Sequence, residues 1–588
     1  MKSTKRLLCV LLALSLLLVC FAGCGNSAAS AASAASEAAS VAEAEPETAA
    51  PAEAEEAPAA EEAPAAEEAS APEAEPASAE EPEEAEPEIE VSYPLTEDDI
   101  TLTYMNREYM LVTDMLEDSD WNNHSLLKAA EEITGVKIDY QAVAAPSMGE
   151  IYALSFASGD YCDMYYWGVK QYTSGADGAI DDDVFIRLNE LIDEYAPYYK
   201  QAREASDEIM RNTISDEGNI VSFYVLNTED VYSGMGYQTR QDLLDEAGLD
   251  VPVTYDDWYE MLTAYKNMGV KYPSYGLGDM GGLLFGGYGI EWNWIDFMNV
   301  PFYQVDGEVQ FSPFSENFEA FLTMCAQWYD EDLVNQDFYS MHDMSDTQAL
   351  EYSGDAGVWT AYANAADLFN TSTTIAGASS VNIPNPVLNE GDQIHLSTAS
   401  SIVGNDCGAI STQCEYPELA VQWLDFWYSP QGTQLLTYGV EGEGFEYDAD
   451  GNPQFTDLIL NNPDGLTSEA VNALYLGYNF AGLFDPTAAL ASYTDNQLDA
   501  LDVWTSNLDT EWNYPSGATL TADESVEYNA VYSDIATYMS TEVTSFVTGA
   551  RSLDTFDDFI ATVEGMGIDR CIELKQAALD RYYSKDIN

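Results

Sequence analysis

The sequence predicts an α/β fold made of two lobes. Between residues 102 and 167, segments with apolar residues at helical spacing alternate with segments in which apolar residues occupy every second position. Strands that alternate with helices form a parallel sheet with right-handed crossovers. The chain then continues for a total of about 500 residues after position 90, which is more than one hydrophobic core supports.

The first unit of the fold can be laid out element by element. A strand is expected at 102–105, and a helix over 126–134 that ends at Gly135. A strand at 136–140 follows, then a helix over 147–158 that closes at Gly159. A last strand, at 162–167, completes the strand–helix–strand–helix–strand order.

Residues with binding chemistry follow two of these strands. Open α/β sheets hold their ligands at the carboxyl ends of the strands. Asn106 and Arg107 come directly after the first strand, and Trp167 ends the third. An amide, a guanidinium and a flat indole ring could bind hydroxyl groups and the apolar face of a sugar, so all three are candidate ligand contacts.

The N-terminal segment predicts export. Three basic residues within the first six precede an apolar run at 7–19 that is short for a membrane span. Phe21-Ala22-Gly23-Cys24 resembles a bacterial lipobox, which implies a signal peptide over 1–23 and lipidation of Cys24. An ordinary cleaved signal with a chance cysteine is the alternative.

Residues 24–90 are expected to form a disordered linker. From residue 25 to 90 they hold 20 Glu, no Lys or Arg, and no aromatic residue. Such a composition has almost no apolar surface to bury, and its like charges and prolines favour an extended chain. At ~3.1 Å per residue the linker reaches at most about 200 Å.

The charge of the remaining domain, residues 91–588, excludes one class of partner. It contains 84 acidic and 16 basic residues, with no Lys or Arg between Lys271 and Arg551. Binding to nucleic acid is therefore excluded on electrostatic grounds. An anionic small ligand is disfavoured because few cations are available to pair with it, so a neutral ligand or a cation fits better.

Cysteine and histidine offer little for a metal or redox site. Five Cys remain after Cys24, an odd number without zinc spacing, and the chain has three His. Cys407 and Cys414 could pair across a turn, but burial as small apolar residues is the favoured interpretation. We predict no metal and no cofactor.

The order of several motifs along the chain resembles one protein family. The motifs are TGVKIDY at 134–140, ASGDYCDMYYWG at 157–168, GYQTRQDLLDEAGL at 236–249, GDAGVWTAY at 354–362 and the segment from Tyr428 to Gly442. In this order they resemble the extracellular solute-binding lipoproteins of sugar-type ABC transporters, family 1, over most of residues 100–585. The resemblance implies a periplasmic-binding-protein-like fold, in which two α/β lobes are joined by a hinge and hold a ligand cleft between them.

The resemblance also guides the expected boundaries. Lobe 1 is placed at about 95–230 plus 400–445, lobe 2 at about 235–398, and C-terminal helices at about 520–585. The first passage between lobes is expected near 226–240 and the return near 395–403. Residues 445–588 could pack on either lobe.

Further candidate ligand contacts lie in the predicted second lobe. Arg240 belongs to the segment that passes between the lobes and could bind hydroxyls or pair with a carboxylate. Large aromatic residues in or beside irregular segments are the other candidates: Trp292, Trp294, Trp359 and Tyr362. Trp167 and Trp359 are expected on opposite walls of one cleft. Trp512 and Tyr514 are weaker candidates.

The predicted function is capture of a neutral carbohydrate, an oligosaccharide, by hinge closure and its delivery to ABC permease subunits. We expect a monomer, held by its lipid on the outer face of a bacterial membrane, and not an enzyme. A receptor for a cationic or peptide-like solute is an alternative. Others are a lipid-anchored glycosidase, which needs only a pair of carboxylates, and a surface adhesin or sensor.

Overall fold

The computed structural model describes most of the chain after the N-terminal segment. The described residues are 89, 91–108, 113, 115–144, 147–228, 234–277, 284–292, 301–340, 344–396, 402–449, 451–463, 466, 468–477, 480–490 and 493–587. The predicted signal peptide, Cys24 and nearly all of the linker lie outside them. The chain divides into residues 1–85 and 86–588, and the description below concerns the second unit.

The first sheet contains the three parallel strands predicted from the sequence and adds β12 as an antiparallel edge strand that the sequence did not predict. Its order is β12-β3-β1-β2, from Ala409–Ile410, Met164–Tyr165, Thr101–Glu108 and Lys137–Ala144. β1 pairs in parallel with β2 and with β3, and Tyr104 lies opposite both Tyr140 and Met164. The predicted βαβαβ order is confirmed, although the third strand is shorter than the 162–167 expected.

Local sequence explains the helices between these strands. α3 (Ser125–Thr134) buries Leu126 and Ala130, and Gly135 ends it with φ 75°. α4 (Met148–Ser158) ends at Gly159 with φ 70°. Both glycines adopt the left-handed conformation that residues with a Cβ rarely take, which is why the helices end where they do.

The first lobe is defined here as the elements whose buried residues pack around the first sheet. A small connecting sheet, β11-β4-β15, adds Val403–Asp406, Tyr224–Asn227 and Leu483–Phe484. A hairpin joins β13 (Phe445–Tyr447) to β14 (Pro453–Phe455). The remaining helices are α5 (Gly168–Gln171), α6 (Gly175–Asp181), α7 (Asn189–Tyr195), α8 (Pro197–Arg203), α9 (Asp207–Asn212), α15 (Pro417–Phe426), α16 (Pro430–Tyr438), α17 (Asp457–Leu460), α18 (Ser468–Tyr475) and α19 (Pro486–Leu490).

The second lobe is defined as the elements around a second sheet, β10-β5-β9-β6. Its strands are Ser380–Ile383, Met235–Arg240, Ala356–Tyr362 and Tyr272–Ser274. β7 (Phe302–Val305) and β8 (Glu308–Phe311) form a hairpin. The helices are α10 (Gln241–Ala247), α11 (Tyr255–Met268), α12 (Phe318–Asp330), α13 (Met344–Ser353), α14 (Leu368–Ser372), α20 (Asp495–Thr505), α21 (Ala522–Val547), α22 (Phe556–Met566) and α23 (Ile568–Ser584).

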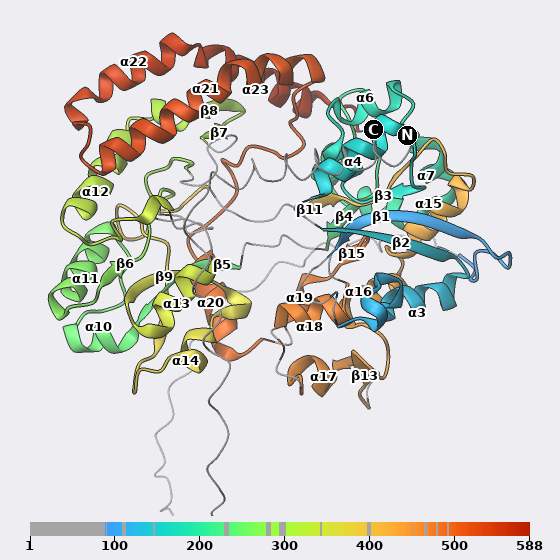
Figure 1. Ribbon diagram of the computed structural model, residues 1–588, viewed down its shortest axis with the longest axis horizontal. Helices are drawn as coiled ribbons and strands as arrows, with labels where there is room; N and C mark the ends of the chain where they lie inside the picture. The colour runs from blue at the N-terminus through green and yellow to red at the C-terminus, as the bar shows by residue number, and fades with distance from the viewer. Residues whose placement is uncertain are drawn as a thin grey trace, which may run out of the picture. The chain divides into compact units, whose positions relative to one another are not determined.

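Buried apolar residues form separate clusters in the two lobes. One cluster joins residues of the first sheet to Trp423, Trp427 and Phe480. Another joins α11 and α12 to the C-terminal helices α21, α22 and α23, which lie side by side in Figure 1. The part of the chain after 445, left open by the sequence, is therefore divided: residues up to about 484 pack on the first lobe, and α20 to α23 pack on the second.

The chain passes between the lobes three times: from β4 to β5, from β10 to β11, and from β15 to α20. Contacts near the C-terminus add a further connection. Lys585 Nζ donates to the carbonyl oxygens of Ile214 at 2.8 Å and Gly517 at 3.2 Å, and Arg581 Nε donates to Asp216 at 2.6 Å. α23 is thus joined to the loop that follows α9 in the first lobe.

Candidate functional site

Trp167 lies at the carboxyl end of the first sheet, as predicted. It has the left-handed conformation, φ 58°, which a bulky residue seldom adopts without a local requirement. Its amide donates to the carbonyl of Asp406 at 2.8 Å, and the side chain of Asp406 accepts the amides of Val169 at 2.9 Å and Lys170 at 3.3 Å. Burial raises the pKa of Asp406 to about 6, although these amides and the Lys170 charge oppose the rise.

Two cations flank the indole of Trp167. The Arg107 guanidinium lies 5.6 Å from the ring centroid and the Lys170 ammonium lies 4.2 Å from it, both within the range of a cation–π interaction. The indole Nε1 and the Arg107 Nε are buried and have no hydrogen-bond partner among the described residues. Trp167 itself is only partly buried. The predicted pair Arg107 and Trp167 therefore form one polar and aromatic surface.

Asn106 requires a correction. Its side chain is fully buried, donates to the hydroxyl of Tyr140, and accepts the amide of Arg107 at 2.6 Å. The alternation of the strand directs it into the lobe, where a polar side chain must find internal partners. In this structure Asn106 organises the interior behind Arg107 and offers no surface to a ligand.

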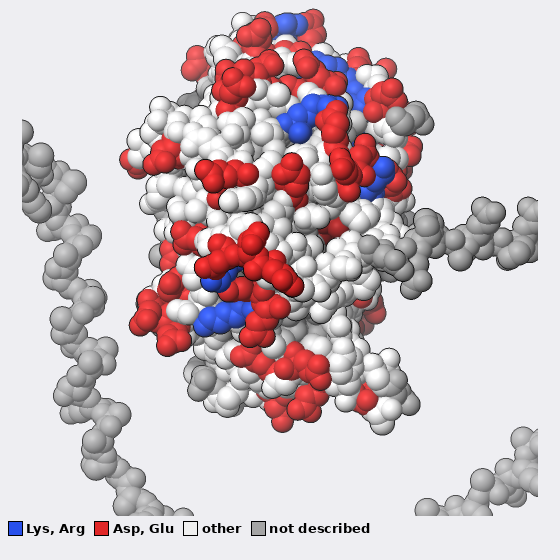
Figure 2. All heavy atoms as spheres, turned by 90° about the vertical axis from the view of Figure 1, so that its right-hand side faces the viewer, with Lys and Arg blue, Asp and Glu red and all other residues white. Residues whose placement is uncertain are grey.

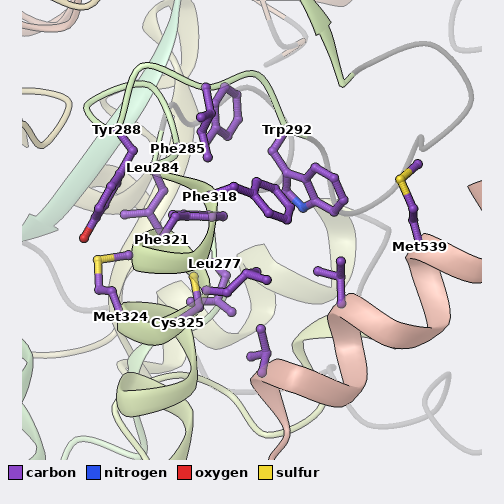
Figure 3. Close-up of a cluster of buried hydrophobic side chains, with 14 of the residues drawn as sticks. Leu277, Leu284, Phe285, Tyr288, Trp292, Phe318, Phe321, Met324, Cys325 and Met539 are labelled. Atoms are coloured by element: carbon purple, nitrogen blue, oxygen red, sulfur yellow. The ribbon is translucent and has the colours of Figure 1, made fainter. Parts of the chain in front are cut away.

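Three predicted contacts of the second lobe are also corrected. Trp292 is 1% exposed and packs edge-on against Phe318 at 4.9 Å, inside the apolar cluster of Figure 3. Trp359 is 2% exposed, donates to Gln238 at 3.2 Å and packs against Phe369. Both belong to the core: β9 buries its first six residues, Trp359 among them, and Phe318 of α12 packs against the ring of Trp292.

Arg240 is the third of these corrections. It is 5% exposed, and its guanidinium binds Asp242 through Nε at 2.7 Å and Nη2 at 2.6 Å. This is the structural role that the sequence left as its alternative. Because both nitrogens are satisfied by a carboxylate, Arg240 has little capacity left for a ligand.

The last two candidates have different outcomes. Tyr362, at the end of β9, is 40% exposed and keeps its ring at the surface. Trp294 lies outside the described residues. The weaker candidates Trp512 and Tyr514 are near each other in the chain, and the Trp512 ring packs against His395 with their centroids 4.7 Å apart and their planes tilted by 40°.

The structure contains a cavity in the second lobe that the sequence did not predict. Its volume is about 600 Å³, and segments far apart in the chain form its walls. The polar or aromatic members are Glu291, Phe302, Tyr303, Asn513, Tyr514, Ser516, Thr519, Ser525, Tyr528, Asn529 and Lys575. Only Tyr514 was a sequence candidate; the others carry no local signal because they look like ordinary loop or helix residues.

Aromatic rings surround the one lysine of this cavity. The Lys575 ammonium lies 5.0 Å from the ring centroid of Tyr514, 5.4 Å from that of Tyr528 and 5.9 Å from that of Phe302. Burial lowers the pKa of Lys575. Burial also shifts Glu291, raising the pKa of its carboxyl group to about 8. The lining of the cavity thus combines polar groups and aromatic rings around a single lysine.

Among the described residues, His395, Asp509 and Glu511 form the one group with the geometry to hold a metal ion. His395 Nδ1 lies 2.9 Å from an Asp509 oxygen and 3.5 Å from a Glu511 oxygen. His395 also packs against the ring of Trp512, with the centroids 4.7 Å apart. All five cysteines of the domain are free, so Cys407 and Cys414 do not pair.

Within the described residues, no helix combines the length and the apolar character needed to cross a bilayer.

Comparisons with known proteins agree with the fold. The family model described as bacterial extracellular solute-binding protein matches residues 124–434. The chain is 23% identical over 532 residues to the fructooligosaccharide ABC transporter substrate-binding protein FusA of Streptococcus pneumoniae, covering 84% of this chain and 92% of FusA. It is 25% identical over 481 residues to lipoprotein LipO of Bacillus subtilis, covering 79% of this chain and 88% of LipO.

Solved structures show the same two-lobed fold. FusA of S. pneumoniae in complex with kestose gives a TM-score of 0.64 at 20% identity, covering 82% of this chain and 99% of that one. The HMO-binding, ABC-transporter-associated solute-binding protein of Bifidobacterium longum infantis gives 0.66 at 16% identity, with the same coverage. The predicted fold class is confirmed.

Proposed function

Because the chain belongs to the family of bacterial extracellular solute-binding proteins, which serve ABC transporters, we propose that it captures an oligosaccharide outside the cell and delivers it to an ABC permease. One observation carries the choice of a sugar. Trp167 keeps part of its ring exposed at the carboxyl end of the first sheet, beside the guanidinium of Arg107. An indole stacks on the apolar face of a sugar, and an arginine binds its hydroxyls.

The mechanism proposed is hinge closure. Three chain connections join the lobes, which allows them to move as units about these segments. A ligand that touches both lobes favours the closed state by as much as its affinity differs between the two states. The permease then distinguishes the closed, loaded protein from the open one.

Two relatives support a carbohydrate. FusA is described as a fructooligosaccharide-binding protein, and the B. longum infantis protein as HMO-binding. With acids outnumbering bases 84 to 16 in the domain, we propose a largely neutral oligosaccharide rather than a polyanion. The sequence of motifs and the family favour a binding protein over a glycosidase or an adhesin.

Membrane attachment through Cys24 is also proposed. A bacterial lipoprotein anchor supplies the two or more acyl chains that stable attachment requires. The variant Cys24→Ser should move the protein from the membrane fraction to the medium. Retention of this variant in the membrane fraction would contradict the anchor while leaving the binding function open.

Uptake of labelled oligosaccharides tests the transport role. Deleting the gene from the bacterium that carries it should abolish uptake of the sugar that the purified protein binds, and the intact gene should restore uptake. Uptake that is unaffected would favour an adhesin or sensor. Chromatography of the sugar after incubation with the protein separates a receptor, which leaves it intact, from a glycosidase, which shortens it.

A further inference from the structure

The cations of this acidic domain are unevenly used. Eleven of its sixteen Lys and Arg residues form ion pairs with a carboxylate within 4.0 Å. Acidic residues far outnumber basic ones on the face of the molecule that Figure 2 shows. Among the described residues, five cations have no such pair: Arg107, Lys128, Lys170, Arg203 and Lys575. Lys128 is exposed to solvent, so only the unpaired cations that are partly withdrawn from solvent need an explanation.

Lys575 lines the cavity of the second lobe, where its neighbours are aromatic rings. Its ammonium faces the rings of Tyr514, Tyr528 and Phe302, which attract a cation but do not neutralise it. Glu291 lines the same cavity, yet no ion pair within 4.0 Å joins it to Lys575. Lys575 is partly buried, and a partly buried cation without a counter-ion is less stable than a paired one, so an anion supplied by a ligand would stabilise it.

A second group in the cavity also lacks a partner. The hydroxyl of Tyr528 is buried without a hydrogen-bond partner among the described residues, and Tyr528 as a whole is 3% exposed. The neighbouring Tyr514 differs, because its hydroxyl donates to the Lys575 carbonyl at 2.8 Å. Buried hydroxyls nearly always have a partner, so an acceptor atom of a ligand that reached this wall of the cavity would satisfy the Tyr528 hydroxyl.

We propose that this cavity binds a carboxylate group, and that the transported oligosaccharide carries a uronic-acid-type residue there. Lys575 would supply the charge and Tyr528 the hydroxyl donor. A carboxylate matches the one cation that lines the cavity, Lys575, whereas a phosphate or a chain with several sulfate groups would bring more negative charge than this lysine can balance. A cationic ligand would be repelled by Lys575.

This inference rests on the proposed function, whose ligand it makes more specific. The low number of Lys and Arg residues disfavours an anionic ligand in general, but it does not exclude a ligand with one carboxylate at Lys575. The composition counts all cations, whereas recognition depends on those which no carboxylate already occupies. A mostly neutral oligosaccharide with one acidic residue satisfies both observations.

The experiment measures binding of the full-length protein to a panel of neutral and carboxylate-bearing oligosaccharides. The neutral members are fructo-, xylo- and manno-oligosaccharides. The acidic members each carry one uronic acid: xylo-oligosaccharides with a single glucuronate substituent, and manno-oligosaccharides that end in one galacturonate, each also supplied as its methyl ester. Lys575→Met should weaken binding of an acidic sugar about 10- to 100-fold, the range for loss of a charged hydrogen bond. Tyr528→Phe, which removes one hydroxyl and leaves the packing, should weaken it roughly 2- to 10-fold.

Lys266→Met is the matched control, because Lys266 is an exposed lysine of the same lobe that pairs with Asp332 at 3.4 Å. It should not change affinity, and methyl esters should bind to the wild type about as weakly as the acid binds to Lys575→Met. Binding of neutral sugars only, or equal binding of acid and ester, would overturn the carboxylate site and leave the oligosaccharide function standing. Binding of no sugar of either class would overturn both.

Discussion

Replacing Trp167 by alanine should weaken oligosaccharide binding by about 5- to 30-fold. A sugar stacked on one face of the indole removes roughly 80–100 Å² of apolar surface from water, worth about 2–2.5 kcal/mol at ~25 cal/mol per Å². Lys170 already lies 4.2 Å from the ring, and loss of its contact on sugar binding offsets about 0.5–1 kcal/mol. The net of about 1–2 kcal/mol gives the stated fold-change.

The backbone of Trp167 provides a second variant. With φ 58°, this position favours glycine, so Trp167→Gly removes the ring and relieves the strain that alanine would keep. Both variants should lose affinity equally, while Trp167→Gly should melt at the higher temperature of the two. Calorimetric titration with the bound sugar and a thermal melt of each variant measure the two effects. Unchanged affinity in both folded variants would refute the assignment of Trp167 to the site.

Three further predictions concern stability and the contact between lobes. Trp359→Ala should lower the free energy of unfolding by ~3–5 kcal/mol, the cost of removing a buried aromatic side chain, whereas Tyr362→Ala in the same strand should lower it by less than about 1 kcal/mol. Urea unfolding of the two variants measures the difference. A larger loss for Tyr362→Ala would show that Trp359 does not belong to the core. Burial raises the pKa of Asp425 to about 7 and of Glu351 to about 8, so the folded state retains protons that the unfolded state releases near pH 4. The stability that these protonated groups provide is lost as the pH rises through 7 and 8, and the melting temperature should therefore fall from pH 5 to pH 8. A melting temperature that rises over this range would contradict the prediction. Lys585→Met should speed amide hydrogen exchange in α9 and in the loop after it, because the ammonium bonds to carbonyls there, and unchanged exchange would show that α23 contributes little to this contact.

The first lobe could be predicted because its signals are local. In α3 the spacing of Leu126 and Ala130 sets the buried face, and Gly135 sets the end. Strand alternation and helix caps depend on neighbours in the chain, and the sequence contains those neighbours. The place of Trp167 at a strand end followed from the same reasoning.

The second lobe was harder because long-range packing decides which aromatic residues are exposed. Trp292 follows a Gly-rich segment with no regular pattern, yet Phe318 of α12 covers its ring. Trp359 lies in a strand that neighbouring strands flank on both sides. No local pattern distinguishes such residues from aromatic residues at a binding surface.

The cavity around Lys575 could not be predicted for a related reason. Its walls come from the segment before β7, from the loop before α21, and from α21 and α23, which are distant in the sequence. The one usable signal was the scarcity of cations, which makes any unpaired lysine unusual. Which lysine remains unpaired is decided only by the folded structure.

Calorimetric titration of the full-length protein with the neutral and acidic oligosaccharides tests the central claim most directly. The account predicts saturable one-to-one binding of an oligosaccharide, stronger for a member with a free carboxylate than for its methyl ester, with the sugar recovered intact. Heat with polyamines or peptides but with no sugar, or recovery of shortened sugar, would contradict it.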